Sequence, residues 1–123
     1  MSRIFIFAAA LLGALGVGLG AFGAHGLAAT LEAAGRTDTF GTATQYQMIH
    51  ALALLAAAWL NDHYPNQWSR RAGWLFILGV LLFSGSLYLL SIFDLRLMGA
   101  VAPFGGAALI AGWVCLGLAA RKP

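Results

Sequence analysis

Polar side chains interrupt segments that are otherwise strongly apolar, and they are the residues best suited to chemistry in this chain. Tyr46 and His50 are four residues apart, so they share one face of a helix, and Gln47 stands beside that face. Histidine changes its charge near neutral pH, so a proton, ion or ligand site would use it. The candidate site residues are His25, Tyr46, Gln47, His50, Ser84 and Ser86.

These polar residues are expected at a similar depth. At about 1.5 Å per residue, His50 lies roughly 10 Å from the N-terminal end of its apolar segment, residues 43–60. Ser84 and Ser86 reach a similar depth in the next segment, and His25 lies slightly nearer the surface at the end of the first. Polar groups from three helices would therefore meet in one layer.

Such a layer has two interpretations. A polar group in lipid is costly unless it is paired, so ionisable residues within a membrane are often functional. Serine, glutamine and neutral histidine also join neighbouring helices through hydrogen bonds, at a typical gain below about 1 kcal/mol each. We favour this structural role and keep a ligand, proton or ion site as the alternative. His25 alone is more typical of a hydrogen-bonding residue at the interface than of a ligand.

Other chemistries find little support in the residue pattern. The sequence contains no carboxylate pair, nucleophile elbow or phosphate-binding loop. Two histidines on adjacent helices suit haem, but glycine-rich helix contacts leave little room for a macrocycle. The single cysteine, Cys115, provides neither a disulfide nor a cysteine-based metal cluster. We therefore predict a protein that is not an enzyme and that has no metal site and no cofactor.

The composition indicates a membrane protein. Of the 123 residues, 61% are hydrophobic and 9% are charged, whereas about a quarter of a soluble domain is charged. The seven lysines and arginines form no basic patch interleaved with aromatic residues, so nucleic acid is not an expected partner despite the net charge of +3. The expected environment is the lipid bilayer.

The elements that must position the polar layer are four apolar segments, each close to the roughly 20 residues that span a membrane. They cover residues 4–22, 43–60, 72–93 and 99–119. Unpaired backbone groups are not tolerated in lipid, so the spans must be helices. A cleaved signal peptide is the alternative for the first segment, but its apolar run is longer than a typical signal sequence requires. The predicted fold is a single all-α domain, residues 1–123, with a four-transmembrane-helix bundle.

The connection between the first two spans predicts a further helix. Leu27 and Leu31 share one face, and Gly35 follows as a stop signal. We expect a short interfacial helix here, lying at the outer surface. Thr37 or Asp38 then provides an N-cap for the second spanning helix.

Basic residues predict the orientation. Five lie on one side of the predicted spans: Arg3, Arg70, Arg71, Arg121 and Lys122. Two lie on the other side: Arg36 and Arg96. Basic residues are enriched in cytoplasmic loops, so both termini are expected in the cytoplasm. Trp59, Trp68 and Trp74 lie near the same inner boundary, where indole rings favour the headgroup region.

Small residues form a stripe on the first and the fourth span. Steps of three and four residues place them on one helix face, and small residues let transmembrane backbones approach closely. On the first span they are Gly13, Gly16, Gly20 and Gly23. On the fourth they are Gly105, Ala108, Gly112 and Cys115. These faces favour a close contact between the first and fourth helices, or between two copies of the protein.

Four motifs carry a resemblance to a known family. In order and spacing, "GAFGAHGL", "YQMIHALALL", "LFILGVLLFSGSLYLL" and "APFGGAALIAGW" resemble the small bacterial membrane proteins grouped as domain of unknown function 423, with an animal relative called transmembrane protein 256. The resemblance covers nearly the whole chain. It implies a four-helix inner-membrane protein and supplies no reaction, ligand or catalytic residue, although all six candidate site residues lie within its motifs.

The expected function follows from these observations. We predict a non-enzymatic structural or accessory protein of the bacterial inner membrane, acting as a homo-oligomer or with a membrane-protein partner. The alternative is a small transporter or channel that uses the polar layer in the outer half of the bundle, as an oligomer.

Overall fold

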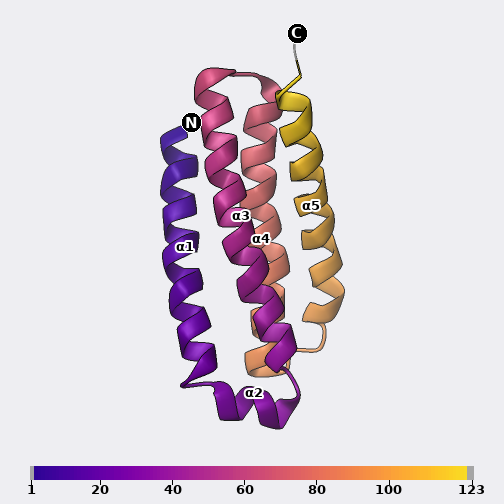
Figure 1. Cartoon of the computed structure of the whole chain (residues 1–123). Coiled ribbons are helices and arrows are strands. Elements are labelled where there is room, and N and C mark those ends of the chain that lie inside the picture. Colours follow the sequence, from indigo (N-terminus) through magenta and orange to yellow (C-terminus); the bar gives the residue numbers. More distant parts are fainter. Residues whose placement is uncertain (1, 122–123) are drawn as a thin grey trace.

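The protein consists of helices joined by short turns. Its structure, a computed structural model, describes residues 2–121, and no strand occurs among them. The helices are α1 (Ser2–Ala24), α2 (Ala28–Ala34), α3 (Thr37–His63), α4 (Gln67–Phe93) and α5 (Met98–Ala119) (Figure 1). The predicted all-α fold is confirmed, and each of the four long helices contains one of the predicted apolar segments.

The connection between α1 and α3 contains the predicted short helix, α2. Leu31 is buried, in agreement with its place on the apolar face of this helix. Gly35 ends the helix in a left-handed conformation with φ of 67°. The backbone N–H groups of Gly35 and Arg36 then donate to the carbonyls of Glu32 and Leu31, at 3.1 and 2.9 Å. These bonds satisfy carbonyl groups that the end of a helix otherwise leaves unpaired.

The prediction for the start of α3 is wrong. Thr37 and Asp38 lie inside the helix, and the residue at the N-cap position is Arg36, whose side chain makes no capping bond. The backbone N–H of Phe40 donates to the carbonyl of Arg36 at 3.0 Å, so the helix starts directly after the turn at Gly35. Asp38 occupies the first turn, where a negative charge stabilises a helix.

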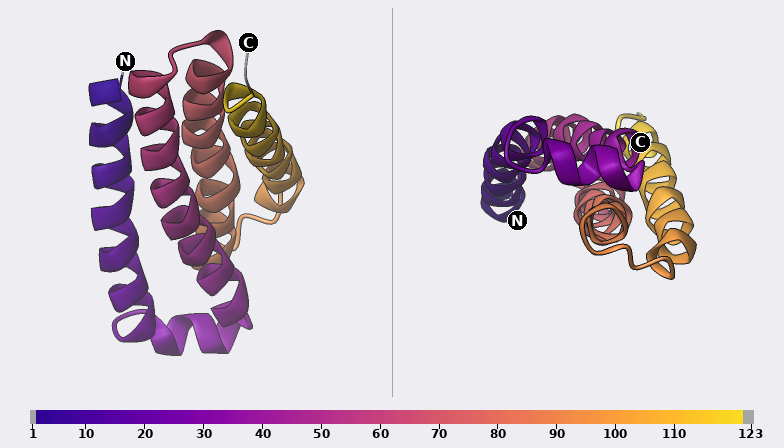
Figure 2. Two further views of the ribbon diagram at one scale, coloured as in Figure 1. Left: turned by 45° about the horizontal axis from the view of Figure 1, so that its top comes forward. Right: turned by 90° about the horizontal axis from the view of Figure 1, so that it is seen from below.

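The long helices lie side by side in the order α1, α3, α4, α5, each antiparallel to the next (Figure 1). α1 packs against α3, α3 against α4, and α4 against α5, and this last contact is the most extensive. Figure 2 shows α1 and α5 at opposite edges of the molecule. The expected contact between the first and fourth spans of one chain is therefore wrong, because α3 and α4 lie between them. A contact between two copies stays a prediction.

The two ends of the described chain lie at the same end of the molecule, beside the turn between α3 and α4 (Figure 1). The basic residues at or next to the helix ends gathered here are Arg3, Arg70, Arg71 and Arg121. Lys122, also expected on this side, lies outside the described residues. At the opposite end, Arg36 forms an ion pair with Asp94, with an N to O distance of 3.4 Å. The Asp94 side chain is largely exposed, so this pair contributes little to stability.

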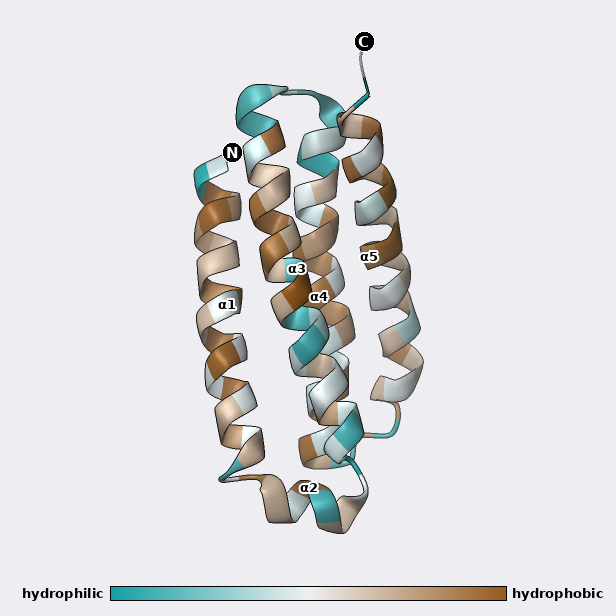
Figure 3. Cartoon of the chain, viewed as in Figure 1, coloured by the Kyte–Doolittle hydropathy of each residue, from teal (hydrophilic) through white to brown (hydrophobic). Residues whose placement is uncertain are grey.

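Three of the long helices, α1, α4 and α5, are long and apolar enough to cross a membrane. α3 has 27 residues but is less apolar, because polar side chains occur along its length (Figure 3). Gln47 and His50 are only 3% and 4% exposed. The polar residues deepest within α3 are therefore turned toward other helices.

The small-residue face of α5 packs against α4. At Gly105 the two backbones touch, because a Cβ atom there would lie 2.3 Å from the backbone nitrogen of Phe83. Gly112 faces the ring of Phe76, and Cys115 belongs to the same core. Ala108, the remaining member of the predicted stripe, is only partly buried.

The glycine stripe of α1 divides between two faces. A Cβ atom at Gly16 or Gly23 would lie 2.4 or 2.2 Å from a side chain of α3, whereas Gly13 and Gly20 have no neighbour within 4 Å. The buried residues of α1 that recur at every seventh position are Ser2, Ala9, Gly16 and Gly23. Positions 13 and 20 lie about 40 to 60° around the helix from this series, at the edge of the contact face, where α3 does not reach them.

Replacing Gly105 by alanine tests the backbone contact between α4 and α5. The added methyl group must force the two helices apart, which typically costs about 1 to 3 kcal/mol. Gly117→Ala is the matched control on the same helix, since no atom lies within 4 Å of the added Cβ. We expect thermal unfolding in detergent to show a lower midpoint for Gly105→Ala and an unchanged or slightly higher one for Gly117→Ala. Equal midpoints for the two variants would contradict the contact.

Candidate functional site

Gln47 lies at the centre of the polar layer and joins three helices. From α3, its Nε2 donates to the backbone carbonyl of Leu12 in α1 at 2.8 Å. Its Oε1 accepts a hydrogen bond from the Tyr88 hydroxyl of α4. Both ends of the side-chain amide are therefore paired, although the residue is almost fully buried.

Gly16 lies beside the bond from Gln47 to α1. The helix carbonyl of Leu12 can accept this bond because its oxygen has a second lone pair besides the one used within the helix. A Cβ atom at position 16 would lie 3.4 Å from Gln47 Nε2, an ordinary contact, but only 2.4 Å from Met48 Sδ. This glycine of the predicted packing stripe therefore makes room for the Met48 side chain next to the bond.

His50 connects α3 with α5. The indole Nε1 of Trp113 lies 2.9 Å from His50 Nε2, and the carbonyl of Tyr46 lies 2.7 Å from His50 Nδ1. Tryptophan N–H only donates and a carbonyl only accepts. His50 Nε2 must therefore be the acceptor and Nδ1 must carry the proton, which defines a neutral ring. Neither nitrogen is left free for a metal ion, a proton or a ligand.

The serines of α4 play different parts. Ser84 Oγ donates to the backbone carbonyl of Ala43 in α3 at 2.8 Å, so it joins two helices. Ser86 Oγ donates to the carbonyl of Phe83 at 2.9 Å, which lies in its own helix. Ser84 therefore belongs to the helix-joining layer, whereas Ser86 satisfies its hydroxyl locally.

Among the described residues, the side chains of two predicted site residues make no hydrogen bond in the layer, although the Tyr46 ring stacks on His50 with 5.9 Å between centroids. Tyr46 is 40% exposed, and its ring packs against Phe83 with 4.8 Å between centroids. His25 is exposed in the turn after α1. The structure thus brings together Gln47, His50 and Ser84, and it adds Tyr88 and Trp113. Each added residue is an amphipathic aromatic with one hydroxyl or N–H that must find a partner when buried, which is the signal that points to such residues.

The buried polar side chains of this layer all have hydrogen-bond partners. Within residues 2–121, no buried side-chain nitrogen or oxygen lacks a hydrogen-bond partner. The same part of the chain contains no group of three or more histidine, cysteine or acidic side chains that would hold a metal ion. The arrangement is suited to joining helices.

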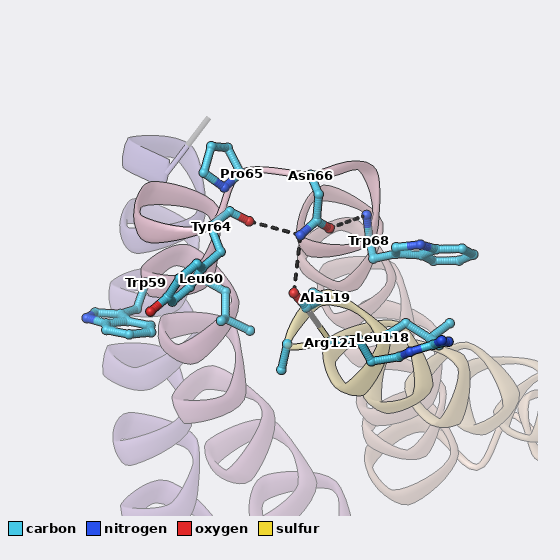
Figure 4. A pocket seen from close by; sticks show the side chains of 10 residues that line it. Trp59, Leu60, Tyr64, Pro65, Asn66, Trp68, Leu118, Ala119 and Arg121 are labelled. Atoms are coloured by element: carbon cyan, nitrogen blue, oxygen red, sulfur yellow. Dashed lines mark hydrogen bonds between the residues drawn. The ribbon is translucent and has the colours of Figure 1, made fainter. Parts of the chain in front are cut away.

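A second set of hydrogen bonds joins the helices at the end that holds both termini. Asn61 of α3 donates through Nδ2 to Ser2 Oγ of α1 at 3.2 Å, and its Oδ1 lies 3.2 Å from Ser69 Oγ of α4. Asn66, which precedes α4, donates to the carbonyl of Ala119 at the end of α5 at 3.2 Å (Figure 4). Together these contacts join all four long helices.

The same asparagine also caps α4. Asn66 Oδ1 accepts from the backbone N–H groups of Trp68 and Ser69 at 2.9 and 3.0 Å, and Ser69 Oγ accepts from the backbone N–H of Asn66. This reciprocal pair is a capping box. Our sequence reasoning missed this network. An asparagine followed three residues later by a serine, directly before an apolar run, is the signal for the cap, but no local pattern signals the bond to α5.

A double-mutant cycle on Gln47 and Tyr88 tests the bond between α3 and α4. Gln47→Leu removes the bonds to both neighbours and leaves the Tyr88 hydroxyl without its partner, so we expect a lower midpoint of thermal unfolding. Tyr88→Phe is expected to be milder, and the double variant should lose less than the sum of the two single losses. The coupling should be near the 0.6 kcal/mol typical of such bonds and not above about 1.7 kcal/mol. Tyr46→Phe, at an exposed ring, serves as the control and should change nothing; strictly additive losses would contradict the bond.

Comparison with known proteins identifies the family of this chain. The family model described as "Protein of unknown function (DUF423)" matches residues 19–106, which include Gln47, His50, Ser84 and Tyr88. The UPF0382 membrane protein YwdK of Bacillus subtilis is 43% identical over 98% of this chain and 98% of its own length. The UPF0382 inner membrane protein YgdD of Escherichia coli K12 is 39% identical over 94% of this chain and 87% of its own. No solved structure matches the chain significantly. This chain belongs to the DUF423 family, and it is an integral membrane protein of unknown function.

Proposed function

We propose that this protein is a four-span, non-enzymatic structural or accessory protein of the bacterial inner membrane, in which the polar layer joins the helices and is not a transport path. The observation that carries the proposal is the pairing of His50. Both of its ring nitrogens are engaged, one by Trp113 and one by the backbone of Tyr46. A proton relay or ligand site requires a group that can change its partner, and every buried side-chain nitrogen and oxygen in the described chain already has one.

The membrane position of α3 is part of the proposal. Its 27 residues correspond to about 40 Å of helix, more than the roughly 30 Å of a hydrocarbon core. It lies between α1 and α4, two helices that are apolar enough to span by themselves. Within its apolar stretch, the Gln47 side chain bonds to α1 and α4 and the His50 side chain to α5, so neither needs to face lipid. These facts support four spans rather than three.

Cytoplasmic termini are likewise proposed. Five basic residues against two favour this orientation, and four of the five lie in the part of the chain that the structure describes. An inner-membrane location is supported by the printed name of the Escherichia coli relative.

We also propose that the protein acts by contact with a second copy of itself or with another membrane protein. α1 and α5 form opposite edges of the molecule (Figure 2), so each has a face that no other long helix of the described chain covers. A protein without a reaction of its own acts through such lateral contacts. Native mass spectrometry of gently extracted protein reports the copy number and any retained partner.

Substitutions of His50 separate the structural role from transport. His50→Gln keeps a side chain that can accept from Trp113, so we expect a nearly unchanged midpoint of thermal unfolding in detergent. His50→Leu leaves the indole N–H without an acceptor and should lower stability by about 0.6 kcal/mol. His25→Leu, in the exposed turn, is the control and should have no effect.

The transporter alternative predicts a different outcome for the same variants. A leucine variant as stable as the parent, together with loss of a bound ligand or of a pH-dependent change near the histidine range, would favour transport. Removing a polar group that is retained for function relieves its desolvation cost, which is why stability would then be kept.

Cysteine labelling tests the orientation. The buried Cys115 is first replaced by serine, so that it does not contribute. A cysteine at Thr37, which is exposed beside Arg36, should react with an impermeant thiol reagent in intact cells. A cysteine inserted after Arg121 should react only after the cells are lysed. The reverse pattern would assign the termini to the outer side.

A further inference from the structure

A groove of about 850 Å³ opens at the end of the molecule that holds both termini. It lies between the last turns of α3 and α5, below the turn that leads into α4 (Figure 4). α3 and α5 both pack on α4, and their direct contact is local, at the bond between Trp113 and His50. The groove follows from this arrangement, because no large side chain fills the space between the two helix ends.

Aromatic and apolar side chains form the walls of the groove. Trp59 and Tyr64 lie together on the side of α3, with 6.0 Å between ring centroids, and both are more than half exposed (Figure 4). Trp68 and Leu118 line the opposite side. Tyrosine and tryptophan rings at the end of an apolar helix favour the headgroup level of a bilayer, where one part of the ring is apolar and another is hydrated.

The groove has a cationic rim. Arg121 lines it and lies on the same side as Trp68 (Figure 4). The Arg71 guanidinium stands over the Trp68 ring, 4.9 Å from its centroid. No carboxylate is among the residues that line the groove in the described chain. The Asn66 amide, which also lines it, is already paired, since both of its N–H bonds go to backbone carbonyls. The only charge among the residues that line the groove in the described chain is therefore the cationic Arg121.

We propose that this groove binds one anionic phospholipid, with the phosphate beside Arg121 and the glycerol and upper acyl chain against the aromatic wall. The charge complementarity identifies the headgroup: a guanidinium attracts a phosphate, and Asp62, the acid in the last turn of α3, is not among the residues that line the groove. The mainly apolar lining distinguishes a lipid from a free phosphate ion, which would leave that lining without a partner. This inference rests on the membrane-embedded arrangement proposed above, but not on the role of His50.

Lipid binding is measured by native mass spectrometry of the full chain in detergent, titrated with phosphatidylglycerol or phosphatidylcholine. We expect one phosphatidylglycerol to be retained in preference to phosphatidylcholine. Arg121→Gln should weaken phosphatidylglycerol binding about fivefold, the loss expected for one basic side chain near a membrane surface. Arg121→Lys should restore most of the affinity. Arg96→Gln is the matched control, because it removes the same charge at the opposite end and should leave binding unchanged.

Three results would overturn the proposal. Equal retention of the two lipids would remove the preference for an anion. If Arg121→Gln and Arg96→Gln weakened phosphatidylglycerol binding equally, binding would depend on the net charge of the protein and not on this groove. Displacement of the lipid by millimolar inorganic phosphate would identify a soluble anion site instead. Arg121 and Arg96 are both exposed, so neither Arg121→Gln nor Arg96→Gln should change thermal unfolding in the absence of added lipid. Loss of the helix-joining role of His50 would instead appear as a change in stability, so the two proposals can fail separately.

Discussion

A polar atom that leaves water without gaining a partner costs about 2 to 7 kcal/mol, and this constraint determines where α3 can lie. α3 carries the amide of Gln47 and the imidazole of His50 within its apolar stretch. Both are satisfied only if acceptors and donors from other helices reach them. Leu12 of α1, Tyr88 of α4 and Trp113 of α5 provide these groups. The least apolar of the long helices therefore lies between α1 and α4, and Trp113 reaches it from α5.

Small residues determine how closely the helices approach one another. At Gly16 an added Cβ atom would lie 2.4 Å from Met48 Sδ, so this glycine lets side chains of α3 reach α1 next to the bond from Gln47 to Leu12. At Gly105 the approach is closer still, because the backbones of α4 and α5 touch there. A larger residue at either glycine therefore acts first on packing.

The two polar networks divide the work between them. The polar layer joins helices near their middle through Gln47, His50 and Ser84. The second network joins all four long helices at the end that holds both termini, through Asn61 and Asn66. Helices joined at two levels have little freedom to change their packing, which agrees with a structural or accessory role. The groove lies beyond the second network, where the ends of α3 and α5 leave room for a small molecule.

Much of this protein could be predicted from the sequence, because the governing signals are local. Apolar length predicts the long helices, the left-handed preference of glycine predicts the end of α2 at Gly35, and the spacing of Tyr46, Gln47 and His50 predicts a polar layer. Only the tertiary structure decided which helices are neighbours, which glycines lie at contacts, and that Trp113 rather than His25 completes the layer. The physical reason is that helical periodicity determines on which face of a helix a residue lies. It does not determine which neighbouring helix packs against that face. The partner is decided by which arrangement satisfies every buried polar group while the small residues are in contact, and that condition involves all four long helices at once.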